Sequence, residues 1–178
     1  DGNINSVLKI CQTHAKFGTT SILPTVMSDL WDDMQKSVSI VKEASEKVTN
    51  GSKIVGVNVE GPFFSVAQRG AQSLDALKIP GRENYHAILD LWDGIKIMGA
   101  APELDGGMEF GDNLKKRGIV ASIAHSDADY DTAVEASDHG YSHITHLYSG
   151  CSTVHRKNAY RIAGVVEAGL LEDKFTVE

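Results

Sequence analysis

Several features are scarce in this 178-residue sequence, and each absence argues against a class of protein. No apolar run approaches the roughly 18 residues that a membrane-spanning helix needs. The two cysteines, Cys11 and Cys151, do not form a CxxC pair, so reduced thiols in a cytoplasmic protein are expected. The net charge of −7 disfavours nucleic acids and anionic membranes as partners, although a local positive site could still bind a small anion.

The motifs of common nucleotide-binding folds are missing as well. No GxGxxG follows the first expected strand, and no GxxxxGK[ST] occurs. The sequence instead alternates between helical and strand periodicity. Strands are expected in 18–26, 53–60, 95–103, 119–126, 142–149 and 175–178, and helices in 4–17, 28–48, 84–92, 108–118, 127–140 and 162–171. Apolar strands joined by helices predict an α/β fold with a parallel sheet.

Polar side chains follow several of the expected strands. Glu60 ends one strand, His125 ends another, and His146 lies near the end of a third. In a parallel barrel the carboxyl ends of the strands face one mouth, so these three side chains could meet there. One carboxylate and two imidazoles suit zinc or a similar first-row divalent ion, with one position left for water.

Each of these residues also has a simpler interpretation. A strand-end glutamate such as Glu60 is more often paired with Lys or Arg, and a single histidine is more often a hydrogen-bonded structural residue. His143 and His146 are three residues apart, so on a strand they point to opposite faces and only one can be a ligand. We expect His146 to be that ligand and His143 to face a helix. Asp127 is expected to cap the helix that follows it.

At these same residues the sequence resembles the N-acetylglucosamine-6-phosphate deacetylases of the amidohydrolase superfamily. The resemblance rests on six segments in the family's order: "GTTSILPT", "VNVEGPFFSVAQRGAQ", "APELDGG", "IAHSDADYDTAVEASDHG", "ITHLYSG" and "HRKNAYRIAGVVEAG". It implies a (β/α)8 TIM-type barrel, of which this chain supplies about six strands. Residues 1–178 would then be the central part of the barrel, without the flanking β domain and the last barrel strands.

The resemblance also implies roles for individual residues. The family's divalent metal, zinc foremost and iron or another first-row ion as alternatives, would be bound by Glu60, His125 and His146. The sugar phosphate would be bound by backbone at Ser149 and Gly150 and by Arg156, an arginine that family members can supply across a dimer interface. Gln72 stands where many members have a substrate-contacting histidine. The family's catalytic Asp, its acid/base, is expected beyond Glu178 and not within this chain.

The function implied by the resemblance is metal-dependent hydrolysis of the acetamide of N-acetylglucosamine 6-phosphate, giving glucosamine 6-phosphate and acetate. We therefore expect a cytoplasmic homodimer that binds a phosphorylated amino sugar. Gln72 and the Ser149–Gly150 pair depart from the family pattern, which leaves another amidohydrolase acting on a different amide as an alternative. A non-catalytic fragment that binds metal or sugar phosphate is a second alternative.

Overall fold

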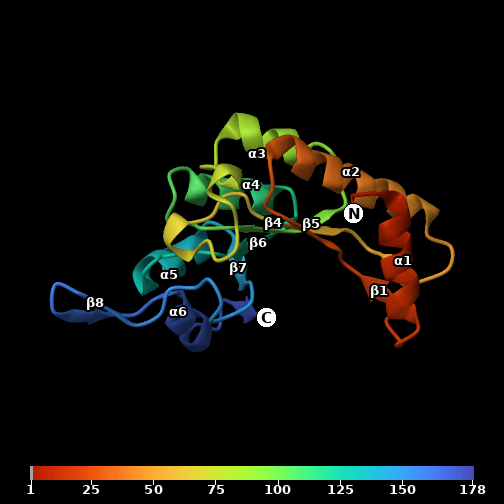
Figure 1. The fold of residues 1–178 in the computed structure, drawn as a ribbon. Helices are drawn as coiled ribbons and strands as arrows, with labels where there is room; N and C mark the ends of the chain where they lie inside the picture. Colours follow the sequence, from red (N-terminus) through yellow and green to blue (C-terminus); the bar gives the residue numbers. More distant parts are fainter. Residues whose placement is uncertain (1) are drawn as a thin grey trace.

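The computed structural model describes residues 2–178, and its centre is a six-stranded parallel sheet (Figure 1). The strands lie in the order β10-β7-β6-β5-β4-β2, and every neighbouring pair is parallel. Their bounds are β2 (Thr25–Met27), β4 (Val57–Glu60), β5 (Ile95–Ala100), β6 (Val120–Ile123), β7 (Tyr141–Ile144) and β10 (Thr176–Val177). The order in space follows the order in the chain, as in the wall of a barrel, and the predicted α/β fold is confirmed.

Two of the expected strands are each divided into two shorter ones. β1 (Ser21–Ile22) and β3 (Lys53–Ile54) pair with each other in a separate parallel sheet, apart from β2 and β4. Pro24, between β1 and β2, has no N–H to donate to a ladder. Gly56, between β3 and β4, has φ +153°, and a Cβ at this position would lie 2.5 Å from the carbonyl oxygen of Gly94. These two residues break the ladder where periodicity alone predicts continuous strands.

The expected helices are present, although most begin two or three residues later or earlier than predicted. They are α1 (Ile4–Ala15), α2 (Trp31–Lys47), α3 (Arg82–Leu89), α4 (Gly107–Lys116), α5 (Tyr130–Asp138) and α6 (Val165–Leu171). The expectation that Asp127 caps α5 is wrong. Asp129 is the cap, and its side chain accepts a hydrogen bond from the N–H of Thr132 at 3.0 Å. No helix in residues 2–178 is long and apolar enough to span a membrane.

The hydrophobic core lies between the sheet and the helices that cover it. The side chains of Met34, Val38, Phe110 and Leu114 are fully buried on α2 and α4, and those of Val59 and Met98 are buried on the central strands. Burial of one such side chain stabilises the fold by roughly 1.5–3 kcal/mol. This packing holds the strands in register and so brings their carboxyl ends to one edge of the sheet.

A short antiparallel hairpin follows β7 in a segment that the sequence analysis did not assign to strands. It consists of β8 (His155–Lys157) and β9 (Tyr160–Ile162), and it projects away from the central sheet (Figure 1). Its turn residues, Asn158 and Ala159, both have positive φ, at 50° and 68°. Positive φ at both central positions is typical of the tight type I′ hairpin turn.

Candidate metal centre

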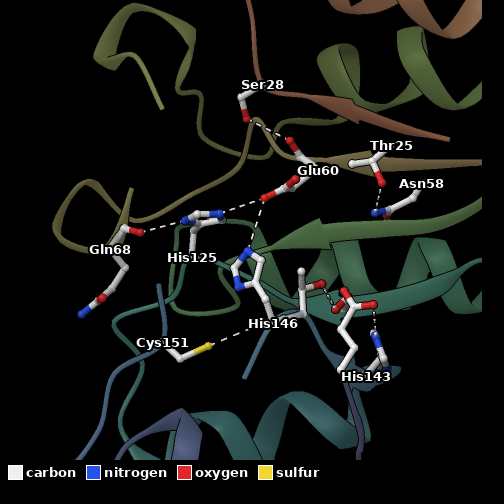
Figure 2. A network of polar contacts seen from close by, with 12 residues as sticks. Thr25, Ser28, Asn58, Glu60, Gln68, His125, His143, His146 and Cys151 are labelled. Atoms are coloured by element: carbon white, nitrogen blue, oxygen red, sulfur yellow. Dashed lines mark hydrogen bonds and ion pairs between the residues drawn. The ribbon is translucent and has the colours of Figure 1, made fainter. Parts of the chain in front are cut away.

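The structure brings together the three strand-end side chains that the sequence analysis selected. Glu60 is the last residue of β4, while His125 and His146 lie two residues beyond the ends of β6 and β7. One ligand atom from each residue lies within 4.8 Å of the others (Figure 2). This convergence follows from the parallel sheet, because strands that end at one edge present the side chains at their carboxyl ends to the same space.

The hydrogen bonds of His125 determine which of its nitrogens is available to a ligand. His125 Nδ1 lies 2.8 Å from the carbonyl oxygen of Gln68, and Nε2 lies 3.0 Å from Oε1 of Glu60. A carbonyl oxygen can only accept, so Nδ1 must carry the proton. In the neutral ring, Nε2 therefore presents a lone pair to a carboxylate oxygen. Two electron-rich atoms at this distance need a proton or a metal cation between them, and the donor set fits either.

The pKa values of Glu60 and His125 reflect the same contact. The hydrogen bond with His125 lowers the pKa of Glu60 below its ordinary value, against the opposing effect of burial. Burial alone would lower the pKa of His125, but the hydrogen bonds to Glu60 and to the Gln68 carbonyl raise it above its ordinary value. Without a metal, both shifts favour an ionised Glu60 carboxylate beside a proton on His125, in the position that a divalent cation would take.

His146 completes the cluster with an unpaired nitrogen. Its Nε2 lies 3.4 Å from Oε1 of Glu60. Its Nδ1 is the one buried side-chain nitrogen or oxygen in residues 2–178 that has no hydrogen-bond partner. Buried polar atoms without a partner are rare in folded proteins. Within residues 2–178 no hydrogen bond fixes the proton on either nitrogen, so the neutral ring can carry its proton on Nδ1 and offer the lone pair of Nε2, which faces Glu60, to a metal ion.

The backbone at both histidines adopts an uncommon conformation. His125 has φ +48° and His146 has φ +35°, in the left-handed region that residues other than glycine rarely occupy. Such a conformation costs roughly 1–3 kcal/mol and persists where surrounding contacts over-determine it. Here the N–H of Ser126 donates to the carbonyl of Gly150 at 3.0 Å, and that of Thr145 donates to the carbonyl of Ile123 at 3.0 Å. The fold therefore fixes these two turns through neighbouring strands and loops.

Aromatic packing limits the freedom of the His125 ring. The ring of Phe64, which is buried, lies with its centroid 4.4 Å from that of His125. The His125 and His146 rings meet edge to face, with centroids 4.9 Å apart. Phe64 thus covers one side of the cluster with an apolar surface, which keeps water from that side and orients Nε2 of His125 towards Glu60.

His143 lies outside the cluster, as the alternation along β7 predicts. Its Nδ1 is 2.8 Å from Oγ1 of Thr176, and its Nε2 is 3.8 Å from Oε2 of Glu178. Both partners belong to β10 or the residue after it. The expectation that His143 faces a helix is therefore wrong, because His143 contacts strand β10 instead. The pairing of β10 with β7 explains the difference, because Thr176 lies directly opposite His143.

The residues expected to bind substrate are placed less uniformly. Gly150, with φ +63°, lies against the cluster: a Cβ at this position would be 2.8 Å from Nδ1 of His125. The N–H of Ser149 already donates to the carbonyl of His146 at 2.9 Å. Gln72 is buried, and its N–H donates to the carbonyl of Arg69 at 3.1 Å. Ser149 and Gly150 are therefore the two of these residues whose contacts with the histidines of the cluster are established.

Arg156 lies on the exposed hairpin, directly opposite Arg161. Neither arginine has an ion-pair partner in the part of the chain that the structure describes. The hairpin projects away from the sheet (Figure 1), and the hydrogen bonds and ion pairs of the cluster within residues 2–178 do not include Arg156.

Two residues near the cluster were not assigned a role by the sequence analysis. Gln68 holds His125 through its backbone carbonyl (Figure 2), and its side-chain amide donates to Oδ1 of Asp127 at 2.7 Å. A backbone contact leaves no trace in residue type, so no sequence signal could have revealed it. Glu103 contacts the turn after His125, and its place after β5 among the other strand-end polar residues was the available signal. Burial raises the pKa of the Glu103 carboxyl, while its hydrogen bonds oppose that change.

Known proteins resemble this chain along most of its length. N-acetylglucosamine-6-phosphate deacetylase of Bacillus subtilis is 33% identical over 165 residues, which is 90% of this chain and 41% of the relative. N-acetylgalactosamine-6-phosphate deacetylase of a Shewanella species is 35% identical over 143 residues, which is 80% of this chain and 36% of the relative. No protein-family model matches the chain.

A solved structure shares the fold. It is an aspartate-to-alanine mutant of N-acetyl-D-glucosamine-6-phosphate deacetylase from Mycobacterium smegmatis, in complex with N-acetyl-D-glucosamine-6-phosphate. It matches with a TM-score of 0.79 at 25% identity and covers 90% of this chain and 40% of the relative. This chain thus spans about two fifths of the length of the proteins that it matches, and by sequence and fold it belongs to the N-acetylglucosamine-6-phosphate deacetylase family.

Proposed function

We propose that the protein containing this chain hydrolyses the acetamide group of N-acetylglucosamine 6-phosphate, releasing acetate and glucosamine 6-phosphate. The observation that carries the proposal is the convergence of Glu60, His125 and His146 at the carboxyl edge of a parallel sheet. Membership of a family whose characterised relatives are named as deacetylases of phosphorylated amino sugars supports the choice of substrate.

The three residues would bind one divalent cation, with zinc as the first candidate because its ligands are commonly histidine and carboxylate. When bound, such an ion polarises a carbonyl group and makes water a stronger nucleophile at neutral pH. Glu60 contributes negative charge, and His125 offers Nε2 because the Gln68 carbonyl keeps the proton on Nδ1. Phe64 shields this side of the site from bulk water.

The proposal assigns proton transfer and phosphate binding to other groups. An aspartate on a strand after residue 178, as the family resemblance implies, would protonate the leaving amine. Arg156 would bind the phosphate as a charge-assisted hydrogen-bond donor. Since the hairpin projects away from its own sheet, Arg156 would serve the site of a second copy in a homodimer. The backbone at Ser149 and Gly150 would border the phosphate, and Gln72 would contact the substrate.

A second candidate substrate is N-acetylgalactosamine 6-phosphate. It is favoured by the Shewanella relative, which is named as a deacetylase of that sugar and is 35% identical to this chain. The two sugars differ only in the configuration of one hydroxyl group, so the same metal chemistry would serve both. We further propose a cytoplasmic location, which the two free, buried cysteines support.

The test is to measure acetate release and metal content for the full-length protein. N-acetylglucosamine 6-phosphate, N-acetylgalactosamine 6-phosphate and unphosphorylated N-acetylglucosamine are compared by kcat/KM. We expect activity to require a divalent ion and to be highest with the first substrate, and a higher value with the second would reassign the sugar. Metal binding without release of acetate from any of the three would support the non-catalytic alternative and contradict the proposal.

A further inference from the structure

Glu103 uses both of its carboxylate oxygens to hold the turn that follows His125. It lies three residues beyond the end of β5, beside the end of β6. The Ser126 hydroxyl donates to Oε2 at 2.7 Å, and the N–H of Asp127 donates to Oε1 at 2.6 Å. We infer that Glu103 is a positioning residue that keeps His125 oriented to bind the cation; this rests on the proposed metal-dependent function.

Ser126, which donates to Glu103, also takes part in other hydrogen bonds of the turn. The Ser126 hydroxyl, besides donating to Glu103, accepts from the N–H of Ala128 at 3.1 Å. The backbone of Ser126 is fixed separately, since its N–H donates to the Gly150 carbonyl and its carbonyl accepts from the N–H of Ser152, both at 3.0 Å. Together these contacts surround the residue that follows the positive-φ position at His125.

A second path leads from Glu103 to the imidazole ring. Asp127, whose N–H is bound by Glu103, accepts a hydrogen bond from the Gln68 side chain at 2.7 Å. The carbonyl of the same Gln68 accepts from His125 Nδ1 at 2.8 Å and so fixes the tautomer that leaves Nε2 free. Glu103 therefore acts on His125 both through the backbone of the turn and through the acceptor on Nδ1. Partners of this kind orient the ligands of a metal site and set its affinity.

The experiment compares three variants in the full-length protein. Glu103→Ala removes both acceptors. Glu103→Gln is the conservative variant, because its amide oxygen can accept from Asp127 N–H and its NH₂ can donate to Ser126 Oγ. Glu109→Ala is the matched control, since Glu109 is an exposed acid whose ion pair with Arg82 lies outside this network. Cobalt(II) affinity and visible absorption bands are measured by titration, and ¹⁵N signals of the histidine rings are recorded on the metal-free protein.

We expect Glu103→Ala to weaken cobalt(II) binding by about 10–100-fold, to change the absorption bands and to shift the His125 ring signals. Glu103→Gln should recover most of the affinity, and Glu109→Ala should change neither readout. A folded Glu103→Ala protein with wild-type affinity, bands and ring signals would overturn the inference. So would a Glu103→Gln protein as impaired as Glu103→Ala, because the role assigned here is one of hydrogen bonding and not of charge.

Two further results separate this inference from its assumptions. If Glu103→Ala does not fold, Ser126→Ala removes one of the two hydrogen bonds, and it should shift the His125 ring signals in the same direction by a smaller amount; unchanged signals would refute the inference. If the wild-type protein binds no cobalt(II), the proposed metal function fails. The ring signals of the metal-free protein would then still decide whether Glu103 orients His125.

Discussion

Two regions of this chain hold their charged side chains in opposite ways. In the cluster at the sheet edge, the Glu60 side chain is 15% exposed and contacts both His125 and His146. In the β8–β9 hairpin, Arg156 and Arg161 are exposed, face each other across the strands and have no acidic partner among residues 2–178. Like charges directly opposite each other destabilise a strand pair, so this arrangement gives the isolated hairpin no benefit.

The difference shows what each region lacks. The cluster offers a carboxylate and imidazole lone pairs to one space, so it needs a positive charge that the fold does not supply. The hairpin offers two guanidinium groups to solvent, where a negatively charged ligand from outside the chain could reach them. The cluster is built on the core, whereas the hairpin contributes little to it. Mutations should therefore separate a metal-binding effect from a phosphate-binding effect.

The largest expected effect is the loss of a cluster side chain. In the full-length protein, His146→Ala should abolish the proposed deacetylase activity and reduce the proposed metal affinity by more than the roughly 10–100-fold that is typical when a ligand's supporting partner is lost. Metal content after dialysis and kcat measure the two effects. His143→Ala is the matched control on the same strand and should retain metal, and a His143→Ala protein that lost it instead would show that the wrong histidine was chosen.

Truncation of an aromatic side chain compares the stability of the two regions. Phe64→Ala removes a buried ring against His125 and should lower the free energy of unfolding by about 3–5 kcal/mol. Tyr160→Ala removes a ring from the hairpin that is 74% exposed, and the change should stay within about 0.5 kcal/mol. Urea denaturation measures both. Similar losses in the two variants would contradict the view that the hairpin is independent of the core.

Arg156→Ala should affect substrate binding with little effect on stability. Loss of a charge-assisted hydrogen bond of about 1.5–3 kcal/mol predicts a KM for the phosphorylated sugar that is raised roughly 10–100-fold. The unphosphorylated sugar should be affected far less. Mixed dimers of Arg156→Ala and His146→Ala subunits would contain one complete site if the arginine crosses to the partner. A wild-type KM in the mixture would support that arrangement, and the raised KM of Arg156→Ala alone would place Arg156 at the site of its own chain.

The smallest expected effect is the loss of stability when Asp129, the N-cap residue of α5, is replaced. Asp129→Ala removes the cap of α5 and should cost about 0.5–2 kcal/mol, whereas Asp127→Ala should leave the helix cap intact. Hydrogen bonding to Thr132 lowers the pKa of Asp129 below its ordinary value. Its contribution is therefore fully present above the ordinary pKa of an aspartate, about 4, and is lost as the pH falls through the lower folded-state value. Denaturation at pH 6 and pH 3 should show a larger difference between the variants at pH 6.

The sequence predicted the sheet and the cluster because both depend on patterns of residue type. Apolar runs identified all six strands of the central sheet, and polar residues at their ends identified Glu60, His125 and His146. The sequence analysis missed the hairpin because its Asn158–Ala159 turn lacks the glycine that marks most such turns. It chose Asp127 over Asp129 because either aspartate in "DAD" suits a helix start. The role of Gln68 depends on a backbone carbonyl, which every residue type possesses.

The order of strands in the sheet has a consequence for the time at which the cluster can form. Glu60 and His146 are 86 residues apart, and each new strand of the sheet from β4 to β7 is added beside the previous one. At synthesis rates of about 5–20 residues per second, the ribosome would release His146 roughly 4–17 seconds after Glu60. During that interval the Glu60 carboxylate lies at the edge of an incomplete sheet, without the imidazole of His146. Binding of the proposed cation would therefore be a late event in the life of the nascent chain, because all three ligands are present only after the turn that follows β7 has formed.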